Sequence, residues 1–237
     1  KLIWHLETYD VTSVRASTPM YFLSKAITDM GIKVVLSGEG ADEIFGGYLY
    51  FRNAPSTEDF QKETIERVQK LFTADLLRAD KSTMAHGLEA RVPFLDKAFL
   101  DVAMLVKPEE KQPKTYDGKE KYILRKAFDT PDNPYLPAEV LWRQKEQFSD
   151  GVGYRWIDQL IEYCASKVTD EQLDSAKESF PYNTPTTKEA YFYRTIFHKY
   201  YPQQSAAETV RKWIPKWQEN QDPSGRANAA HVQADVE

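Results

Sequence analysis

The sequence contains very little cysteine and histidine. Cys164 is the single cysteine among 237 residues, so an internal disulfide framework is excluded and a reducing compartment is expected. The four histidines are scattered without the spacing of metal ligands, which argues against structural zinc. No apolar run approaches the roughly 20 residues that a membrane helix requires. The sequence therefore predicts a protein without disulfides, structural zinc or a membrane span.

Positive charge is outnumbered by negative charge. The formal net charge is −5, and no basic stripe alternates with aromatic residues, which argues against nucleic-acid binding. No internal repeat or signal-peptide pattern is present, and we expect a cytoplasmic protein. A hydrophobic content of 41% over 237 residues is enough for one large domain or two small ones. Because the chain starts at Lys1 without methionine, we expect it to be a piece of a longer protein.

The most informative stretch covers residues 34–48, with the sequence VVLSGEGADEIFGGY. An apolar, β-branched run from Ile32 to Leu36 predicts a buried strand. Ser37 and Gly38 follow it, at the strand end where open α/β sheets bind their ligands. Glycines in such a turn let backbone N–H groups approach a bound anion. The stretch therefore predicts a ligand-binding turn between a strand and a helix.

This turn is unusually acidic for one that only holds phosphate. Glu39, Asp42 and Glu43 stand where a phosphate loop would carry bare N–H groups and a lysine. Carboxylates beside bound phosphates indicate a divalent cation between them. From the residues alone, a second interpretation stays open: a glycine-rich turn whose solvated acids favour the start of a helix.

Helices are predicted on both sides of this stretch. Upstream, Ser17 or Thr18 would cap a helix that has Pro19 in its first turn and ends at Gly31. Downstream, Asp96 would cap another helix. Apolar spacing predicts further helices over 57–78 (one or two), 119–128, 156–167, 169–179 and 188–200.

Two polar segments lead to more specific predictions. Residues 107–118 are predicted to form an exposed, mobile loop, because they combine prolines with an Asp-Gly pair. The charged residues of 80–91 alternate with apolar ones, which predicts a buried, mutually paired cluster. Its members are Asp80, Lys81, Glu89 and Arg91.

Three blocks of sequence together resemble a known family. They are SGEGADEIFGGY at 37–48, GLEARVPFLD at 87–96 and RQKEQFSDG at 143–151. In this order they closely resemble the synthetase domain of glutamine-hydrolysing asparagine synthetases, and the match extends from about Lys1 to Arg226. The resemblance implies the α/β fold class. The chain would be the largely helical C-terminal part, 1–217, of an ATP-pyrophosphatase-like (adenine nucleotide alpha hydrolase-like) parallel-sheet domain, with 218–237 as a disordered or surface-draped tail.

The resemblance implies a ligase of asparagine biosynthesis. In that reaction ATP activates the side-chain carboxylate of aspartate as β-aspartyl-AMP, pyrophosphate leaves, and ammonia from glutamine displaces AMP. The family pattern places ATP at Ser37 and Gly38 and Mg²⁺ at Asp42. This assignment requires Asp42 and Lys145 to lie close together, because both would face the same nucleotide.

Further roles follow from the same resemblance. Glu39 is expected to be catalytic and to contact substrate, and Lys145 is expected to meet the phosphate charge as pyrophosphate leaves. Thr12 and Arg15 match positions near the substrate, and Arg15 is counted among the catalytic candidates. Taken without the family, Arg15 and Lys145 are each predicted to be ordinary surface residues.

The chain departs from the family in two respects. It has no N-terminal cysteine nucleophile of a glutaminase domain and no Ser-Gly-Gly-x-Asp-Ser pyrophosphate loop. We therefore expect this chain to be inactive alone and to need both missing parts; a homodimer is compatible with the sequence. Two alternatives stay open: a related carboxylate-adenylating amidoligase such as a β-lactam synthetase, and a non-catalytic binding or scaffold module.

Overall fold

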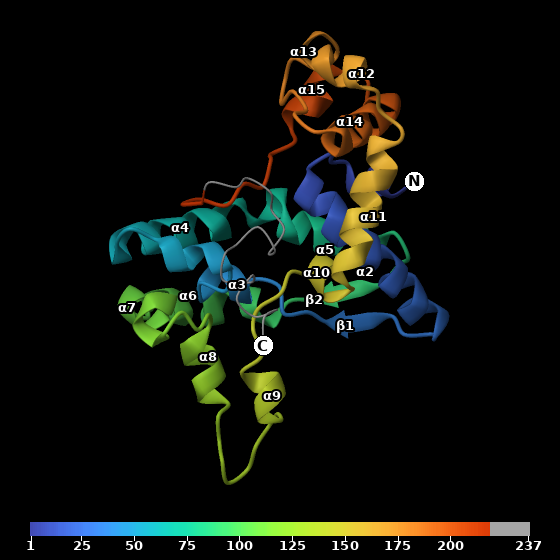
Figure 1. Ribbon diagram of the computed structural model, residues 1–237. Coiled ribbons are helices and arrows are strands. Elements are labelled where there is room, and N and C mark those ends of the chain that lie inside the picture. The colour runs from blue at the N-terminus through green and yellow to red at the C-terminus, as the bar shows by residue number, and fades with distance from the viewer. Residues whose placement is uncertain (219–237) are drawn as a thin grey trace. The chain divides into compact units, whose positions relative to one another are not determined.

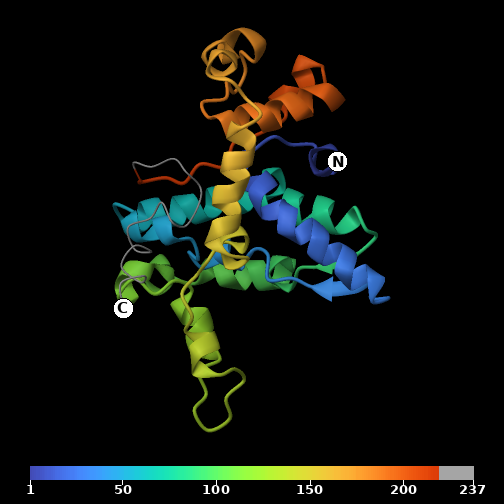
Figure 2. The ribbon, with the colours of Figure 1, turned by 45° about the vertical axis from the view of Figure 1, so that its right-hand side comes forward.

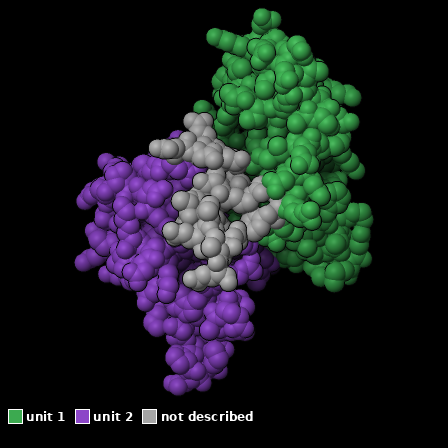
Figure 3. All heavy atoms as spheres, in the orientation of Figure 1, with its two compact units in different colours: residues 1–35, 72–90, 147–214 green, residues 36–71, 91–146, 215–237 purple. Residues whose placement is uncertain are grey.

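The computed structural model describes residues 1–218, which form helices and one short sheet (Figure 1). They divide into two compact units whose segments alternate along the chain (Figure 3). Unit 1 contains 1–35, 72–90 and 147–214, and unit 2 contains 36–71, 91–146 and the residues from 215 onward. The predicted tail, 218–237, lies outside the described residues except for Gln218. Among the described residues, no helix is both long and apolar enough to span a membrane.

Unit 1 is helical and encloses its own apolar core. Its helices are α1 (Leu2–Leu6), α2 (Val11–Asp29), α5 (Asp75–Met84), α10 (Phe148–Gly151), α11 (Tyr154–Ala165), α12 (Asp170–Asp174), α13 (Ala176–Ser179), α14 (Lys188–Tyr200) and α15 (Gln204–Glu208). The helix α11 leads from α10 toward α12 and α14 (Figure 2). The core is centred on Leu6, Cys164 and Phe197, none of which is more than 1% exposed.

Unit 2 consists of shorter helices. They are α3 (Ala41–Ile44), η1 (Leu49–Asn53), α4 (Thr57–Lys70), η3 (Pro93–Leu95), α6 (Lys97–Leu105), α7 (Pro108–Lys111), η4 (Pro113–Tyr116), α8 (Tyr122–Ala127) and α9 (Ala138–Leu141). The short helix η2 (Leu71–Thr73) begins in unit 2 at Leu71, and its other two residues belong to unit 1. Ile44 of α3 and Phe45, which follows that helix, pack with Ala103 of α6 to form a core beside the turn after Leu36.

The sheet has two parallel strands in the described part of the chain, β1 (Val34–Leu36) and β2 (Glu89–Arg91). Glu89 N–H donates to Lys33 O at 2.9 Å, and Ser37 N–H donates to Arg91 O at 2.8 Å. The predicted fold class, a largely helical α/β chain with a parallel sheet, is confirmed. The expectation that β1 is buried is wrong, since Leu36 is 76% exposed. Strands become fully buried in larger parallel sheets with helices on both faces, whereas this sheet has two strands among the described residues.

The start of α2 differs from the prediction. Ser17 and Thr18 lie inside the helix, and Asp10 caps it by accepting the Ser13 N–H at 2.9 Å. The second carboxylate oxygen of Asp10 accepts the N–H of Trp213 at 2.9 Å. A proline at 19 suggested a helix start, but contacts from a distant segment fix the start of α2 earlier. The predicted end of the helix at Gly31 is confirmed, because the helix stops at Asp29 and Gly31 has φ 85°.

Residues 107–118 are not an exposed loop. They form α7 and η4, and Lys111 is 1% exposed. The Lys111 ammonium donates to the carbonyl of Ala103 at 3.3 Å, close to the end of α6. A cation is favourable near helix-terminal carbonyls, and the long apolar stem of lysine packs well in a core. The middle of the segment, 111–113, is therefore buried although its composition is polar.

The predicted burial of the charge cluster of 80–91 is also wrong. Asp80, Glu89 and Arg91 are exposed, and Lys81 pairs with Glu7 at 3.0 Å. Most predicted helices are confirmed. The 57–78 pattern resolves into α4 and α5, Asp96 caps α6 by accepting the Phe99 N–H, and 169–179 contains α12 and α13.

Candidate functional site

The turn after β1 depends on glycines that pack closely against other residues. Gly40 has φ 94° and stands at the start of α3, where an added Cβ would lie 2.4 Å from Leu95. An added Cβ at Gly47 would lie 1.9 Å from the carboxylate of Asp42. At Gly38, in contrast, an added Cβ would have no neighbour within 4 Å. The backbone beside Ser37 is therefore open, while the rest of the turn is tightly packed.

Asp42 lies between two lysines of unit 2. One of its carboxylate oxygens is 3.0 Å from the ammonium of Lys121, and the other is 3.3 Å from that of Lys145. All three side chains are 19% exposed. Burial acts to raise the pKa of Asp42, but the positive charges of Lys145 and then Lys121 outweigh it and lower the pKa to about 2. The contact that the sequence required between Asp42 and Lys145 is present.

Lys145 also lies near an aromatic ring of the same turn. Its ammonium is 5.8 Å from the centre of the Tyr48 ring, within the range of a cation–π interaction. The Tyr48 hydroxyl donates to the carboxylate of Glu43, which is 2% exposed. Glu39, by contrast, is half-buried at the open end of the turn. Asp42 and Glu43 are thus engaged inside the protein, and Glu39 is the acid placed nearest the open backbone.

Sequence reasoning missed Lys121. It lies at the start of α8 in the left-handed region, with φ 55° and ψ 31°, an unusual conformation for a lysine. The preceding Asp117-Gly118 pair signals a turn, but nothing local indicates that this lysine meets Asp42. The two lysines bring concentrated positive charge to a turn whose own sequence is acidic. That arrangement can attract an anion such as a polyphosphate.

Comparison with known proteins identifies the family. Residues 1–60 and 52–229 match the family model described as asparagine synthase. The chain belongs to the asparagine synthase family. The site just described lies within the matched residues.

Several relatives are similar over nearly the whole chain. A probable asparagine synthetase (glutamine-hydrolyzing) of Dictyostelium discoideum is 58% identical over 236 residues, which cover 98% of this chain and 42% of that protein. Asparagine synthetase (glutamine-hydrolyzing) 1 of Saccharomyces cerevisiae is 58% identical over 237 residues, which cover 97% of this chain and 41% of that protein. The root asparagine synthetase (glutamine-hydrolyzing) of Pisum sativum is 56% identical over 240 residues, which cover 95% of this chain and 41% of that protein. The chain thus spans about two fifths of the length of these curated relatives.

The other two positions that match the asparagine synthase pattern, Thr12 and Arg15, belong to unit 1. Arg15 is 4% exposed, so its interpretation as a surface residue is wrong. Its guanidinium donates to both carboxylate oxygens of Glu189, at 2.9 and 2.6 Å, and Tyr193 donates to the same carboxylate at 3.0 Å. These contacts give Arg15 a structural function in α2, and the substrate roles of Thr12 and Arg15 stay predictions.

The arrangement around Asp42 does not by itself fit a divalent cation. Both of its oxygens face ammonium groups, which would repel a second positive charge. Within residues 1–218, no group of three or more His, Cys, Asp or Glu side chains is placed to hold a metal ion. Magnesium binding at Asp42, implied by the resemblance to asparagine synthetases, stays a prediction.

Proposed function

We propose that this chain is the adenylating part of a glutamine-hydrolysing asparagine synthetase, active within a longer cytoplasmic protein. Two observations support the proposal. The chain belongs to the asparagine synthase family, and its turn after β1 carries a carboxylate held between two lysines, Lys121 and Lys145. The contact between Asp42 and Lys145 is the observation that carries the proposal, because it brings distant segments of the matched sequence to one site.

The proposed reaction has two steps. First, a side-chain carboxylate oxygen of aspartate attacks the α-phosphorus of ATP, a new P–O bond forms, and the bond to the β-phosphate breaks to release pyrophosphate. Second, ammonia attacks the activated carbonyl carbon, a C–N bond forms, AMP leaves with the electrons of the C–O bond, and a proton is lost from nitrogen. The products are asparagine, AMP and pyrophosphate.

The two lysines would act on the phosphate groups. An incoming polyphosphate would compete with Asp42 for the ammonium groups of Lys121 and Lys145, which now contact that carboxylate at 3.0 and 3.3 Å. Lysine acts on phosphate as a point charge, and its stabilisation of a leaving group is strongest in a site that excludes water. In this proposal Lys145 stabilises the charge that develops on pyrophosphate as it leaves.

The turn itself would bind the nucleotide and the substrate. The open backbone at Ser37 and Gly38 gives phosphate or adenosine groups access to main-chain N–H donors. Glu39 would order the amino group of aspartate or the incoming ammonia, since a carboxylate attracts the ammonium group of aspartate and accepts an N–H from ammonia. Glu39→Gln should therefore reduce pyrophosphate exchange if Glu39 orders aspartate, and asparagine formation alone if it orders ammonia; unchanged rates in both assays would exclude this role.

Exchange of labelled pyrophosphate into ATP, in a full-length protein that contains this chain, tests the proposal. With aspartate as substrate, we expect Lys145→Ala to lower exchange by about 10²–10³-fold, the usual loss when one charge-stabilising group is removed. Lys126→Ala is the matched control, because Lys126 lies in unit 2 but is 56% exposed and pairs with Asp129.

The same assay separates the alternatives. Exchange that requires another carboxylic acid instead of aspartate would indicate a related amidoligase, such as a β-lactam synthetase. No exchange with any acid would indicate a binding or scaffold module. Full exchange in Lys145→Ala would refute the role given to Lys145.

A further inference from the structure

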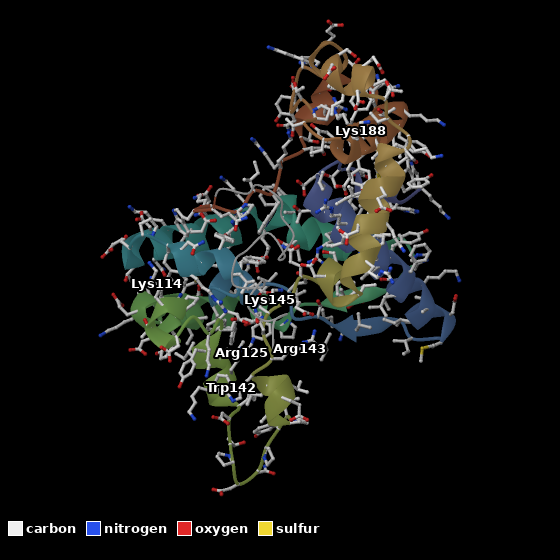
Figure 4. The ribbon with its side chains drawn as sticks, viewed as in Figure 1. Lys114, Arg125, Trp142, Arg143, Lys145 and Lys188 are labelled. Carbon is white, nitrogen blue, oxygen red and sulfur yellow. The ribbon has the colours of Figure 1, made fainter. Side chains whose placement is uncertain are left out.

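The lysine at the centre of the proposed site lies on a segment without regular structure. Residues 143–147 follow α9 and precede α10, and none of them is in a helix or strand. Side chains of unit 2 hold this segment instead. Figure 4 shows Lys145, Trp142 and Arg125 near one another, with Lys145 toward the turn after β1 and the other two toward α8 and α9.

Glu120 is the side chain that contacts the backbone of Lys145. Its carboxylate accepts the Lys145 N–H at 2.5 Å, and the side chain is 4% exposed. The same carboxylate accepts from Arg125 and Arg52, each at 3.2 Å. Glu120 thus has two guanidinium partners beside the Lys145 N–H, and a hydrogen bond to a carboxylate is stronger than one between neutral groups.

Arg125 holds the segment at a second point. Its guanidinium donates to the carbonyl of Leu141, the last residue of α9, and to the main-chain carbonyl of Glu120 at 2.9 Å. Between these two anchors, the ring of Trp142 lies 5.5 Å from that of Tyr122. The segment that carries Lys145 is thus held at Leu141 by Arg125 of α8 and at Lys145 by Glu120, which precedes α8.

The conformation of Lys121 explains why two adjacent residues contact different parts of the site. With Lys121 in the left-handed region, the Glu120 side chain meets the backbone of Lys145, while the Lys121 side chain meets Asp42. Asp42 in turn contacts the Lys145 ammonium at 3.3 Å. The main chain and the charged end of Lys145 are therefore each held by a separate contact.

We propose that Glu120 is a positioning residue, which fixes the main chain of Lys145 so that its ammonium reaches the phosphate site. The inference rests on the proposed function of Lys145. Glu120 does not itself need to contact substrate. An error of about 1 Å in the position of a catalytic group can reduce a rate by about a hundredfold.

Hydrogen exchange at the Lys145 amide tests the contact without reference to activity. In the full-length protein, Glu120→Ala should lower the protection of this amide by about tenfold to a hundredfold, the usual range for a lost bond to a charged acceptor. Glu120→Gln keeps a carbonyl oxygen as acceptor and should retain part of the protection. The control is Glu139→Ala, an exposed glutamate on α9. Equal protection in the wild type and Glu120→Ala would overturn the proposal.

A double-mutant cycle in the pyrophosphate-exchange assay separates positioning from a general structural role. Glu120→Ala should reduce exchange about tenfold to a hundredfold when Lys145 is present, and should have almost no effect in the Lys145→Ala background. Equal effects in both backgrounds would refute positioning. A normal rate for Lys145→Ala alone would instead refute the proposed function, so the two failures are distinguishable. Circular dichroism of Glu120→Ala, which should match the wild type, shows whether the rates compare folded proteins.

Discussion

Lys111 provides a quantitative test of how unit 2 is packed. This lysine is 1% exposed, and the contact that the structure gives its ammonium is to the carbonyl of Ala103 at 3.3 Å. Burial lowers the pKa of Lys111 from 10.5 to about 8. Since one pKa unit corresponds to about 1.4 kcal/mol, keeping this amine charged at pH 7 costs the folded protein about 3 kcal/mol.

Replacement by methionine should therefore stabilise unit 2. Lys111→Met keeps a long flexible stem and removes the charge, but it loses one hydrogen bond worth about 1 kcal/mol. We expect a net gain of about 2 kcal/mol in the free energy of unfolding at pH 7.

The gain should also depend on pH in a defined direction. Below the folded pKa of about 8, the folded and unfolded chains both carry the proton, and the folded chain bears the full cost. From about 8 up to 10.5, the ordinary pKa of lysine, the unfolded chain binds more protons, so wild-type stability rises with pH and the advantage of Lys111→Met shrinks.

Urea titration, monitored by hydrogen exchange of the backbone amides of α6 and α7 at pH 7 and at pH 10, measures the gain in stability and its dependence on pH. This readout follows the unfolding of unit 2 rather than of the whole protein. Lys107→Met, at an exposed position of the same segment, should leave stability nearly unchanged. A Lys111→Met protein that is less stable than the wild type at pH 7, or a difference that does not change with pH, would refute the reasoning.

Three further predictions concern the candidate site and the core. Asp42→Asn should lower the free energy of unfolding at pH 7 by up to about 2 kcal/mol. Because the lysines lower the pKa of Asp42 to about 2, this difference from the wild type should vanish as pH falls from about 4 to about 2. Urea unfolding over this pH range checks it. Gly47→Ala should reduce pyrophosphate exchange at least tenfold, since the new Cβ would lie 1.9 Å from the Asp42 carboxylate; an active Gly47→Ala protein would contradict the described packing. Cys164 should resist alkylation by iodoacetamide at pH 8 until the protein unfolds, because it is 0% exposed and burial raises the pKa of its thiol to about 11; rapid labelling of the native protein would count against the described core.

Local patterns predicted the elements whose cause is local. The strand before Ser37 and the cap of α6 at Asp96 both follow from residues within a few positions of each other. The start of α12, within the helix predicted over 169–179, also has a local cause, because Thr169 and Gln172 bond to each other's backbone. The prediction failed at the start of α2, where Asp10 caps the helix by accepting the Ser13 N–H and is also held by Trp213, far along the chain.

Polar composition was a poor guide to burial. Residues 107–118 were predicted to be an exposed loop, yet Lys111 is enclosed by unit 2. Arg15 alone resembles a surface residue, yet its partner Glu189 in α14 allows it to be buried. The compensating group is the Ala103 carbonyl of the preceding helix for Lys111 and the Glu189 carboxylate, far along the chain, for Arg15, and neither contact can be read from residue types alone.

The sequence by itself determined the family, the acidic glycine turn at 37–48 and the choice of Lys145, because these depend on residue types in a fixed order. Only the tertiary structure decided that Asp42 lies between two lysines and that Glu120 holds the backbone of Lys145. Charge pairs and buried hydrogen bonds depend on distance in space, and distance in space depends on how distant segments pack. The residue types of the turn therefore follow from the local sequence, whereas the fold sets the protonation of Asp42 and the geometry of its contacts.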